Sequence, residues 1–234
     1  MKWPFAIDCK DAFLHLFFPH LCAGCSSDIL DEQALICAAC LRSLPFTEFE
    51  KIENNPVEKL FWGRTKIQHA SSIFYFITDS PLQEIIHHIK YKNNPALGVY
   101  MGNIMGLRLK NMLSINKIDF MLPMPLHPKK EYARGYNQAS VLCQGIQETT
   151  DTPYLNNILL RNFNTGTQTK KSRIERWENV AEVFEISAPS AVQEKHILLI
   201  DDVITTGAST EACVNLLIKN KAASVSICSL AYTI

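Results

Sequence analysis

The stretch that most constrains the fold of this chain is residues 196–210, HILLIDDVITTGAST. It begins with a short, continuous apolar run, which is typical of a strand buried on both faces of a sheet. Asp201 and Asp202 end that run, and a turn rich in hydroxyl groups follows. From Ala208 onward the pattern predicts a helix that returns over the sheet. Because ligands of such sheets bind beyond the carboxyl ends of the strands, this turn is an expected binding position.

The turn offers the groups that a phosphate monoester needs. Gly207 permits a close approach of the backbone, and the helix that follows directs unpaired N–H groups at an anion. The hydroxyl donors are those of Thr205, Thr206, Ser209 and Thr210. Because Asp201 and Asp202 would repel a phosphate, we expect them to bind ribose hydroxyls or a magnesium ion. The predicted ligand is a sugar phosphate together with a metal.

This stretch resembles the motif with which type I phosphoribosyltransferases bind phosphoribosyl pyrophosphate (PRPP). The resemblance implies that PRPP is bound by Val203, Ile204, Thr205, Thr206, Gly207, Ala208, Ser209 and Thr210, next to the acidic pair. Two other interpretations stay open: a paired-aspartate metal site of another α/β protein, and a plain turn with Thr at the helix N-cap.

Length and composition favour a globular protein. The 234 residues suit one medium domain plus a small module, and 47% hydrophobic with 20% charged residues argues against global disorder. Basic and acidic residues balance, 23 against 23, so the net charge makes no case for nucleic acid as a partner.

The N-terminal residues 1–22 are apolar but interrupted. Asp8, Lys10, Asp11 and His15 break the run that a signal peptide requires, so an amphipathic helix that docks on the body is expected. No segment approaches the roughly 18 to 20 apolar residues needed to span a bilayer. We therefore predict a cytoplasmic protein without membrane insertion.

Four cysteines form two CxxC pairs, Cys22 with Cys25 and Cys37 with Cys40, separated by eleven residues. Four sulfurs from two tight turns satisfy tetrahedral zinc with no open position, which is typical of a structural metal site. A segment of about 40 residues has too small a core to fold alone, so the metal would supply folding energy. Disulfides and a redox CxxC are the alternatives, disfavoured by the cytoplasmic setting and by the duplication respectively.

The remaining pattern predicts three parts: an N-terminal helix and zinc-ribbon-like module (1–46), a linker (47–66) and a body (67–234). Within the body we expect a strand over 71–77, helices over 81–92, 95–112 and 136–149, and a β-like run over 224–232. Gly98, Gly102 and Gly106 make a smooth ridge on the helix over 95–112. Charged residues on that helix argue against a membrane role, so we expect the ridge to pack closely on a neighbouring element.

A second site signal is residues 118–128, IDFMLPMPLHP, a strand that runs into three prolines. If this strand is parallel to the first, its loop lies at the same end of the sheet and can offer N–H groups to a pyrophosphate. Lys129, Lys130 and Arg134 would assist. The expected contacts are Pro123, Met124, Pro125, Leu126, His127, Lys129 and Arg134. A plain Pro-rich turn before the helix over 136–149, with Asn137 near its N-cap, is the alternative.

The residues PMPLHPKKEYARGYNQA resemble the LHP…RGxNQ signature of the ComF family, which is associated with natural competence and DNA uptake. The paired CxxC motifs are similar to that family too. The resemblance covers essentially the whole chain and implies a type I phosphoribosyltransferase fold, a parallel sheet flanked by helices, behind a small zinc module with four cysteine ligands.

A third stretch, residues 161–184, has a local surplus of positive charge. In type I enzymes a segment at this place closes over the substrate as a lid, and the resemblance implies that Lys170 and Lys171 contact PRPP while Arg176 is catalytic. Lys171 stands where the family pattern has an apolar residue. A solvated charged loop is the alternative.

Together the three loops predict a magnesium-dependent phosphoribosyltransferase with Asp201, Asp202 and Arg176 as catalytic residues and an unidentified acceptor. Magnesium at the acidic pair and basic groups would stabilise the leaving pyrophosphate, and lid closure would exclude water. His127 would transfer a proton or have a structural role. The alternative function is a non-catalytic PRPP-binding component of the transformation machinery that contacts single-stranded DNA or proteins.

Overall fold

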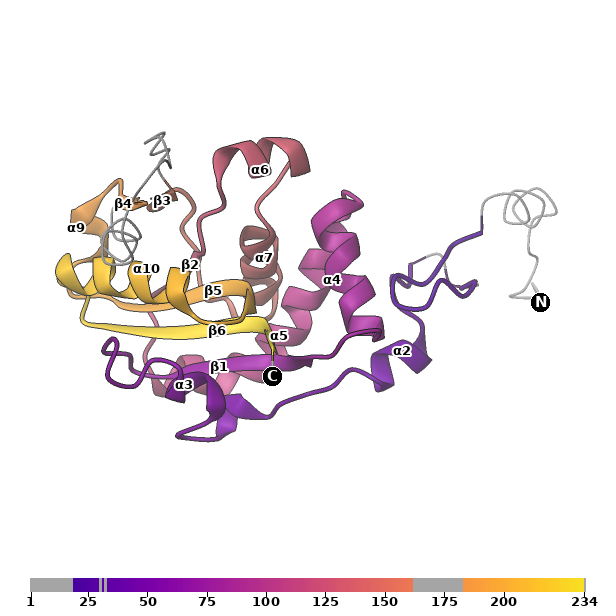
Figure 1. The fold of residues 1–234 in the computed structure, drawn as a ribbon, viewed down its shortest axis with the longest axis horizontal. Helices are drawn as coiled ribbons and strands as arrows, with labels where there is room; N and C mark the ends of the chain where they lie inside the picture. Colours follow the sequence, from indigo (N-terminus) through magenta and orange to yellow (C-terminus); the bar gives the residue numbers. More distant parts are fainter. Residues whose placement is uncertain (1–18, 30, 32, 162–182, 234) are drawn as a thin grey trace, which may run out of the picture.

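The computed structural model describes residues 19–29, 31, 33–161 and 183–233. A four-stranded sheet forms the centre of this part of the chain, and its neighbouring strands are all parallel (Figure 1). In sheet order the strands are β1 (Ala70–Phe76), β6 (Ser224–Thr233), β5 (His196–Ile204) and β2 (Phe120–Pro123). A separate antiparallel pair consists of β3 (Leu159–Arg161) and β4 (Phe184–Ile186).

Helices cover both faces of the sheet. One apolar cluster joins the sheet to α4 (Pro81–Tyr91), α5 (Pro95–Ile115) and α7 (Gln138–Thr150). The other joins it to α10 (Ala208–Lys219) and to α3 (Pro56–Lys59). Short helical segments elsewhere are α2 (Ala38–Arg42), η1 (Phe49–Lys51), α6 (Pro128–Arg134) and α9 (Pro189–Val192). The predicted fold class, a parallel sheet flanked by helices, is confirmed.

Strand β5 alternates between the two apolar clusters. Ile197 and Leu199 face the side of α10, whereas Leu198 and Ile200 face the side of α5 and α7. The prediction of a strand buried on both faces is therefore confirmed. The strand is longer than its apolar run, because its pairing with β6 continues from Asp201 to Ile204. The acidic pair lies inside the strand rather than after it.

The predicted glycine ridge packs against α7. A Cβ atom at Gly102 would lie 2.3 Å from the carbonyl oxygen of Leu142, and one at Gly145 of α7 would lie 2.0 Å from that of Val99. Two backbones approach this closely only where side chains are absent. The expectation of close helix packing is confirmed.

Helix α6 corrects the prediction of a loop after the proline-rich strand end. His127 is its N-cap, Pro128 occupies the first turn, where its missing N–H is not needed, and Gly135 ends the helix with φ of 82°. The other helices and strands expected in the body agree with the structure to within a few residues, and the expected N-terminal helix lies largely outside the described residues. Asn137 is the N-cap of α7, as predicted.

Residues 47–66, expected as a linker, pack on the body. Val57 and Phe61 are fully buried, and the Asn55 side chain donates to the carbonyl oxygens of Ala70 at 2.7 Å and Ile52 at 2.9 Å. Residues of the cysteine module, including Cys22 and Cys40, share an apolar cluster with α4. The domain division at residues 46 and 66 stays a prediction.

Candidate functional site

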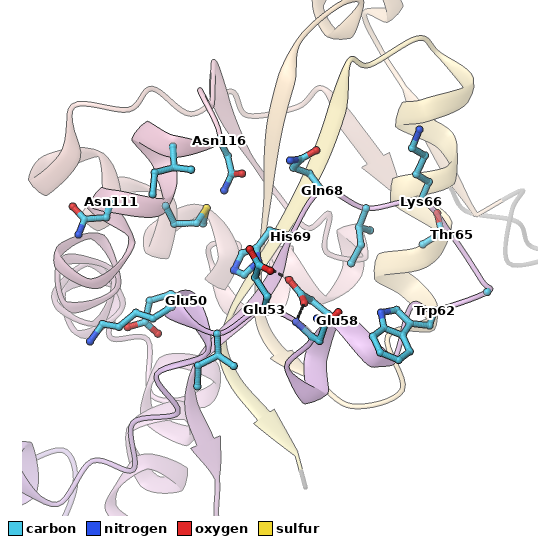
Figure 2. A pocket seen from close by; sticks show the side chains of 17 residues that line it. Glu50, Glu53, Glu58, Trp62, Thr65, Lys66, Gln68, His69, Asn111 and Asn116 are labelled. Carbon is cyan, nitrogen blue, oxygen red and sulfur yellow. Dashed lines mark hydrogen bonds and ion pairs between the residues drawn. The ribbon is translucent and has the colours of Figure 1, made fainter.

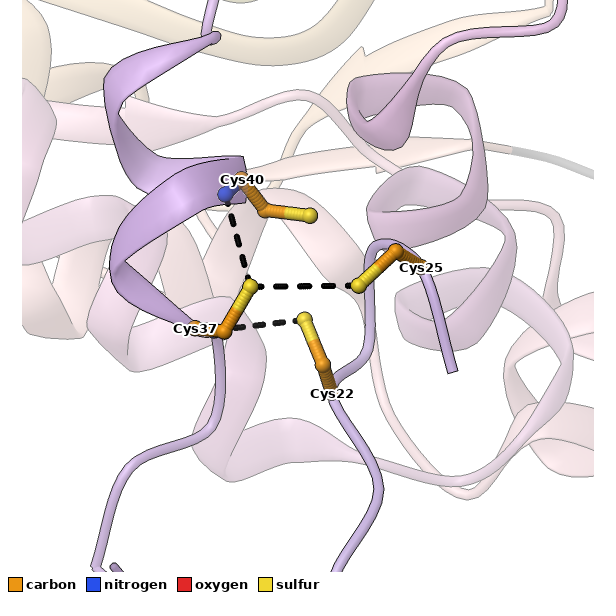
Figure 3. A group of neighbouring side chains, drawn as sticks. All are labelled: Cys22, Cys25, Cys37 and Cys40. Atoms are coloured by element: carbon orange, nitrogen blue, oxygen red, sulfur yellow. Dashed lines mark hydrogen bonds between the residues drawn. The ribbon is translucent and has the colours of Figure 1, made fainter. Parts of the chain in front are cut away.

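The four paired cysteines converge. The Sγ atoms of Cys22, Cys25, Cys37 and Cys40 all lie within 4.8 Å of one another (Figure 3). The Sγ atoms of Cys25 and Cys37 are 3.8 Å apart. Tetrahedral zinc with Zn–S bonds of about 2.3 Å separates its sulfurs by about 3.8 Å, whereas a disulfide needs about 2 Å. The donor set therefore fits a structural zinc ion.

Backbone N–H groups point at the sulfurs. The N–H groups of Cys37 and Gly24 donate to Cys22 Sγ at 3.2 and 3.4 Å, and that of Cys40 donates to Cys37 Sγ at 3.4 Å. Burial raises the pKa of Cys22, but these donors lower it to a net value below that of an ordinary thiol. A hydrogen bond with Ser27 lowers the pKa of Cys25 to about 6. These effects favour the thiolate form that binds metal at those two cysteines.

The acidic pair directs its carboxylates to two sides of the sheet. Asp202 Oδ2 pairs with Lys90 Nζ of α4 at 2.9 Å. Asp201 lies on the other side, near Cys213 of α10. The pKa of the Cys213 thiol is raised mainly by burial and secondly by the charge of Asp201. Burial, and then the charge of Asp202, raises the pKa of Asp201 to about 8. Burial and the neighbouring charge therefore favour the protonated form of Asp201.

The predicted phosphate loop has an open helix N-terminus. Gly207 precedes α10 with φ of 70° and makes no side-chain cap, so the first N–H groups of the helix are not bonded to a capping side chain. Thr205, Thr206 and Ser209 are exposed around it, whereas Thr210 is buried. The loop is therefore open to an anion through three of its four predicted hydroxyls.

Arg64 and Phe61 support this loop. Arg64 donates to the carbonyl oxygen of Thr206 at 3.0 Å and pairs with Glu211 in the first turn of α10. A Cβ atom at Gly207 would lie 3.0 Å from the Phe61 ring. Arg64 and Glu211 are 147 positions apart, so no local sequence signal marks this contact.

The predicted pyrophosphate loop lies beside the phosphate loop. Strands β2 and β5 are adjacent and parallel, and Met124 N donates to the carbonyl oxygen of Ile200 at 2.8 Å. The side chain of Asn137 donates to Met124 O at 2.9 Å, and Nδ1 of His127 accepts from Lys129 N at 3.2 Å. His127 thus has a structural role as the cap of α6.

Helix α6 separates the residues expected to act together at this loop. A cavity of about 520 Å³ beside the loop is lined by residues that include Pro123, Pro125, Leu126 and, from α6, Pro128 and Glu131. Lys130 and Arg134 instead line a different cavity, on another face of the helix. The predicted residues Lys170, Lys171 and Arg176 lie outside the described residues.

A cavity of about 880 Å³ lies at the opposite edge of the sheet, near the start of β1 and the end of α5 (Figure 2). Its buried acidic groups are already paired: Glu50 with Arg108 at 2.6 Å, and Glu58 with Nδ1 of His69 at 2.5 Å. It contains none of the predicted site residues.

Several proteins of known name are similar to the chain. Competence protein F from Haemophilus influenzae is 27% identical over 222 residues, which cover 93% of each chain. DNA utilization protein YhgH from Escherichia coli K12 is 27% identical over 157 residues, or 66% of this chain and 68% of the relative. Competence protein ComFC from Bacillus subtilis is 36% identical over 107 residues, or 45% of this chain and 41% of the relative.

These relatives support a ComF family protein. The resemblance found in the LHP…RGxNQ signature is thereby confirmed. No family model matches the chain.

Two solved structures are similar to the chain at a lower level of sequence identity. Glutamine phosphoribosylpyrophosphate amidotransferase from B. subtilis has a TM-score of 0.39 and 19% identity, covering 57% of this chain and 26% of that chain. Hypoxanthine phosphoribosyltransferase from Trypanosoma cruzi has a TM-score of 0.39 and 9% identity, covering 58% and 73%. Because these TM-scores are below 0.5, the fold described above rests on the strand order and helix packing of this chain.

Within the described ranges, no helix has the length and apolar character needed to cross a membrane. The cytoplasmic location stays a prediction.

Proposed function

We propose that this ComF family protein is a phosphoribosyltransferase that binds PRPP and magnesium at the carboxyl edge of its parallel sheet. The supporting observation is that the loops after β2 and β5 meet on adjacent parallel strands, with Met124 bonded to Ile200. One loop ends at the open N-terminus of α10, and the other, which is rich in proline, ends at His127, the N-cap of α6. Two neighbouring loops of this kind suit a ligand with phosphates at both ends of a sugar.

The residues of the edge have distinct roles in this proposal. The first N–H groups of α10, with the hydroxyls of Thr205, Thr206 and Ser209, bind the 5′-phosphate. The protonated form of Asp201 both donates and accepts, which suits ribose hydroxyls. The loop of residues 123–127 and Lys129 bind the pyrophosphate.

Magnesium fits the oxygen donors of the acidic pair, since hard cations prefer carboxylates and hydroxyls. When bound, it would offset the charge that develops on the departing pyrophosphate. Asp202 is the stronger candidate ligand, because it already holds a cation, the Lys90 ammonium group, at 2.9 Å.

The reaction is the transfer of the phosphoribosyl group to an acceptor. The acceptor's lone pair forms a bond to C1′ while the C1′–O bond breaks and pyrophosphate leaves with the electron pair. No nucleophile from the protein is needed. Arg176 and the lid of residues 161–184 are proposed to stabilise the leaving group and exclude water.

The decisive measurement is pyrophosphate release from PRPP across a panel of nitrogen bases and amines, with and without DNA. We expect release with at least one acceptor, and a loss of about 10²- to 10³-fold in Asp202→Asn. Asp151→Asn, the same change at an exposed position after α7, should retain activity. Absence of PRPP binding in the unaltered protein would contradict the function, and normal turnover in Asp202→Asn would contradict the role of Asp202.

We also propose an association with natural competence and DNA uptake, supported by the names of the relatives, which are competence and DNA utilization proteins. In the alternative function PRPP is only a ligand and the chain binds single-stranded DNA. Binding of a single-stranded oligonucleotide by the full chain would then weaken steeply between about 50 and 200 mM salt. Undetectable binding at low salt would exclude this alternative.

A further inference from the structure

A basic cavity of about 380 Å³ lies between the end of α4 and α6. It is lined by Lys90, Tyr91, Asn93, Lys130, Ala133 and Arg134. Three of these residues are cations and none is a carboxylate. The volume is within the roughly 300 to 1,000 Å³ of small-molecule sites.

The walls of the cavity are held in place by contacts of its own residues and their neighbours. Arg134 donates to Gln138 Oε1 at 2.6 Å, and its guanidinium lies 5.3 Å from the centre of the Tyr91 ring. The hydroxyl of Tyr136 donates to the carbonyl oxygen of Ile89, which ties the turn after α6 to α4. Arg134 and Tyr91 are therefore already positioned by these contacts before a ligand binds.

This basic cavity is distinct from the cavity at the predicted pyrophosphate loop. Pro128 and Glu131 of α6 line the loop cavity, whereas Lys130, Ala133 and Arg134 line the basic one, and the two cavities share no residue. Lys130 and Arg134 are four residues apart and share one face of the helix. The bound pyrophosphate proposed above therefore does not account for the basic cavity.

Lys90 connects the basic cavity to the acidic pair. Its ammonium group lines the cavity and also contacts Asp202 at 2.9 Å, with 22% of each side chain exposed. In the part of the chain that the structure describes, Lys130 has no ion pair, so its charge faces the cavity without a partner. Lys130 and Arg134, for which the described residues provide no carboxylate partner, attract an anion, and lysine and arginine bind phosphate through charge-assisted hydrogen bonds.

We propose that this cavity binds a phosphate group of the acceptor, next to the acidic pair, and that Lys90 contacts that phosphate. The inference rests on the proposed phosphoribosyl transfer and names the acceptor class as phosphate-bearing. The phosphate has two possible sources, a free nucleotide and a nucleic-acid strand. Both are tested.

The probes are the four common nucleoside 5′-monophosphates and a short single-stranded oligonucleotide, titrated into the full chain at low salt. We expect Lys130→Glu to weaken binding of one of the two by about tenfold or more. Lys92→Glu is the matched control, since Lys92 is exposed at the end of α4 and does not line the cavity. Lys130 is exposed as well, so neither change should unfold the protein.

The outcomes separate this inference from the proposed function. Weakened nucleotide binding identifies a free nucleotide, and weakened oligonucleotide binding alone identifies a strand; both support the inference. If Lys130→Glu has no larger effect than Lys92→Glu, or if neither probe binds the unaltered protein, the inference is wrong. If Lys130→Glu weakens PRPP binding as strongly, the cavity belongs to PRPP and the acceptor assignment is wrong. Lysine-dependent nucleotide binding without PRPP binding would contradict the phosphoribosyltransferase proposal and the acceptor role, while phosphate binding by the cavity would stand.

Discussion

In the cysteine cluster all four ligand atoms come from residues 22–40, whereas the carboxyl edge of the sheet collects side chains from positions as far apart as Arg64, Lys90 and Glu211. The cluster is held by tight turns and by N–H groups that point at sulfur. The edge is held by parallel strands and by helices packed on both faces. The cluster is therefore built from one short segment of the chain, whereas the edge depends on packing between distant segments.

The largest effect is expected from removing the metal of the cysteine cluster. We expect Cys37→Ser, or exhaustive chelation, to abolish zinc binding and to unfold residues 19–46 as a unit, because the segment has little core of its own. Zinc content and the sites of limited proteolysis report both effects. Cys143→Ala is the control, since Cys143 is buried in α7 outside the cluster. Full zinc content in Cys37→Ser would show that the cluster does not hold zinc.

A second change tests the dependence of the sheet edge on distant packing. Gly145→Ala places a methyl group 2.0 Å from the carbonyl oxygen of Val99 and should force α5 and α7 apart. We expect a loss of about 2 to 3 kcal/mol in the free energy of unfolding. Chemical denaturation measures it. Gly63→Ala, where no atom lies within 4 Å and only φ of 71° is unfavourable, should cost less, about 1 kcal/mol. Equal costs would contradict the packing argument.

A third change removes the support of the phosphate loop. Arg64→Met leaves Glu211, with 12% of its side chain exposed, without its cationic partner, and should cost about 1 to 3 kcal/mol. Hydrogen exchange at residues 205–211 should rise at the same time. The double variant Arg64→Met with Glu211→Gln should recover part of the loss. If the double variant is as unstable as the sum of the two single variants, the ion pair contributes nothing.

The smallest effect is expected at the opposite end of the strands. Asp119 accepts from His196 N at 2.7 Å and from Lys195 Nζ at 3.3 Å, and the first of these contacts is the main one that lowers the pKa of the carboxyl group. A carboxyl whose pKa is lower in the folded state stabilises the fold above its unfolded pKa of about 4, and that stability is lost as pH falls through the folded value. Asp119→Asn should therefore cost at most about 1 kcal/mol at pH 7 and nothing at pH 2. A cost that is independent of pH would contradict this assignment.

The features that the sequence predicts correctly follow the same division. The buried strand, the N-cap at Asn137, the glycine ridge and the convergence of the four cysteines all leave a local pattern in the sequence, and all are confirmed. Helix α6 differs from the prediction, because proline indicates a loop but also suits a first helical turn. The roles of Arg64 and Lys90 leave no sequence signal, because their partners lie far away along the chain.

The sequence by itself determined the layered α/β fold class, the cysteine cluster and the signature of the family, because periodicity, CxxC spacing and loop chemistry are local properties. Only the tertiary structure decided that the acidic pair directs its carboxylates to opposite sides and that Lys90 meets Asp202. Only the tertiary structure placed Lys130 and Arg134 in a cavity of their own. These outcomes depend on where a strand continues and on which helix packs beside it, and those are set by contacts between residues remote in the chain.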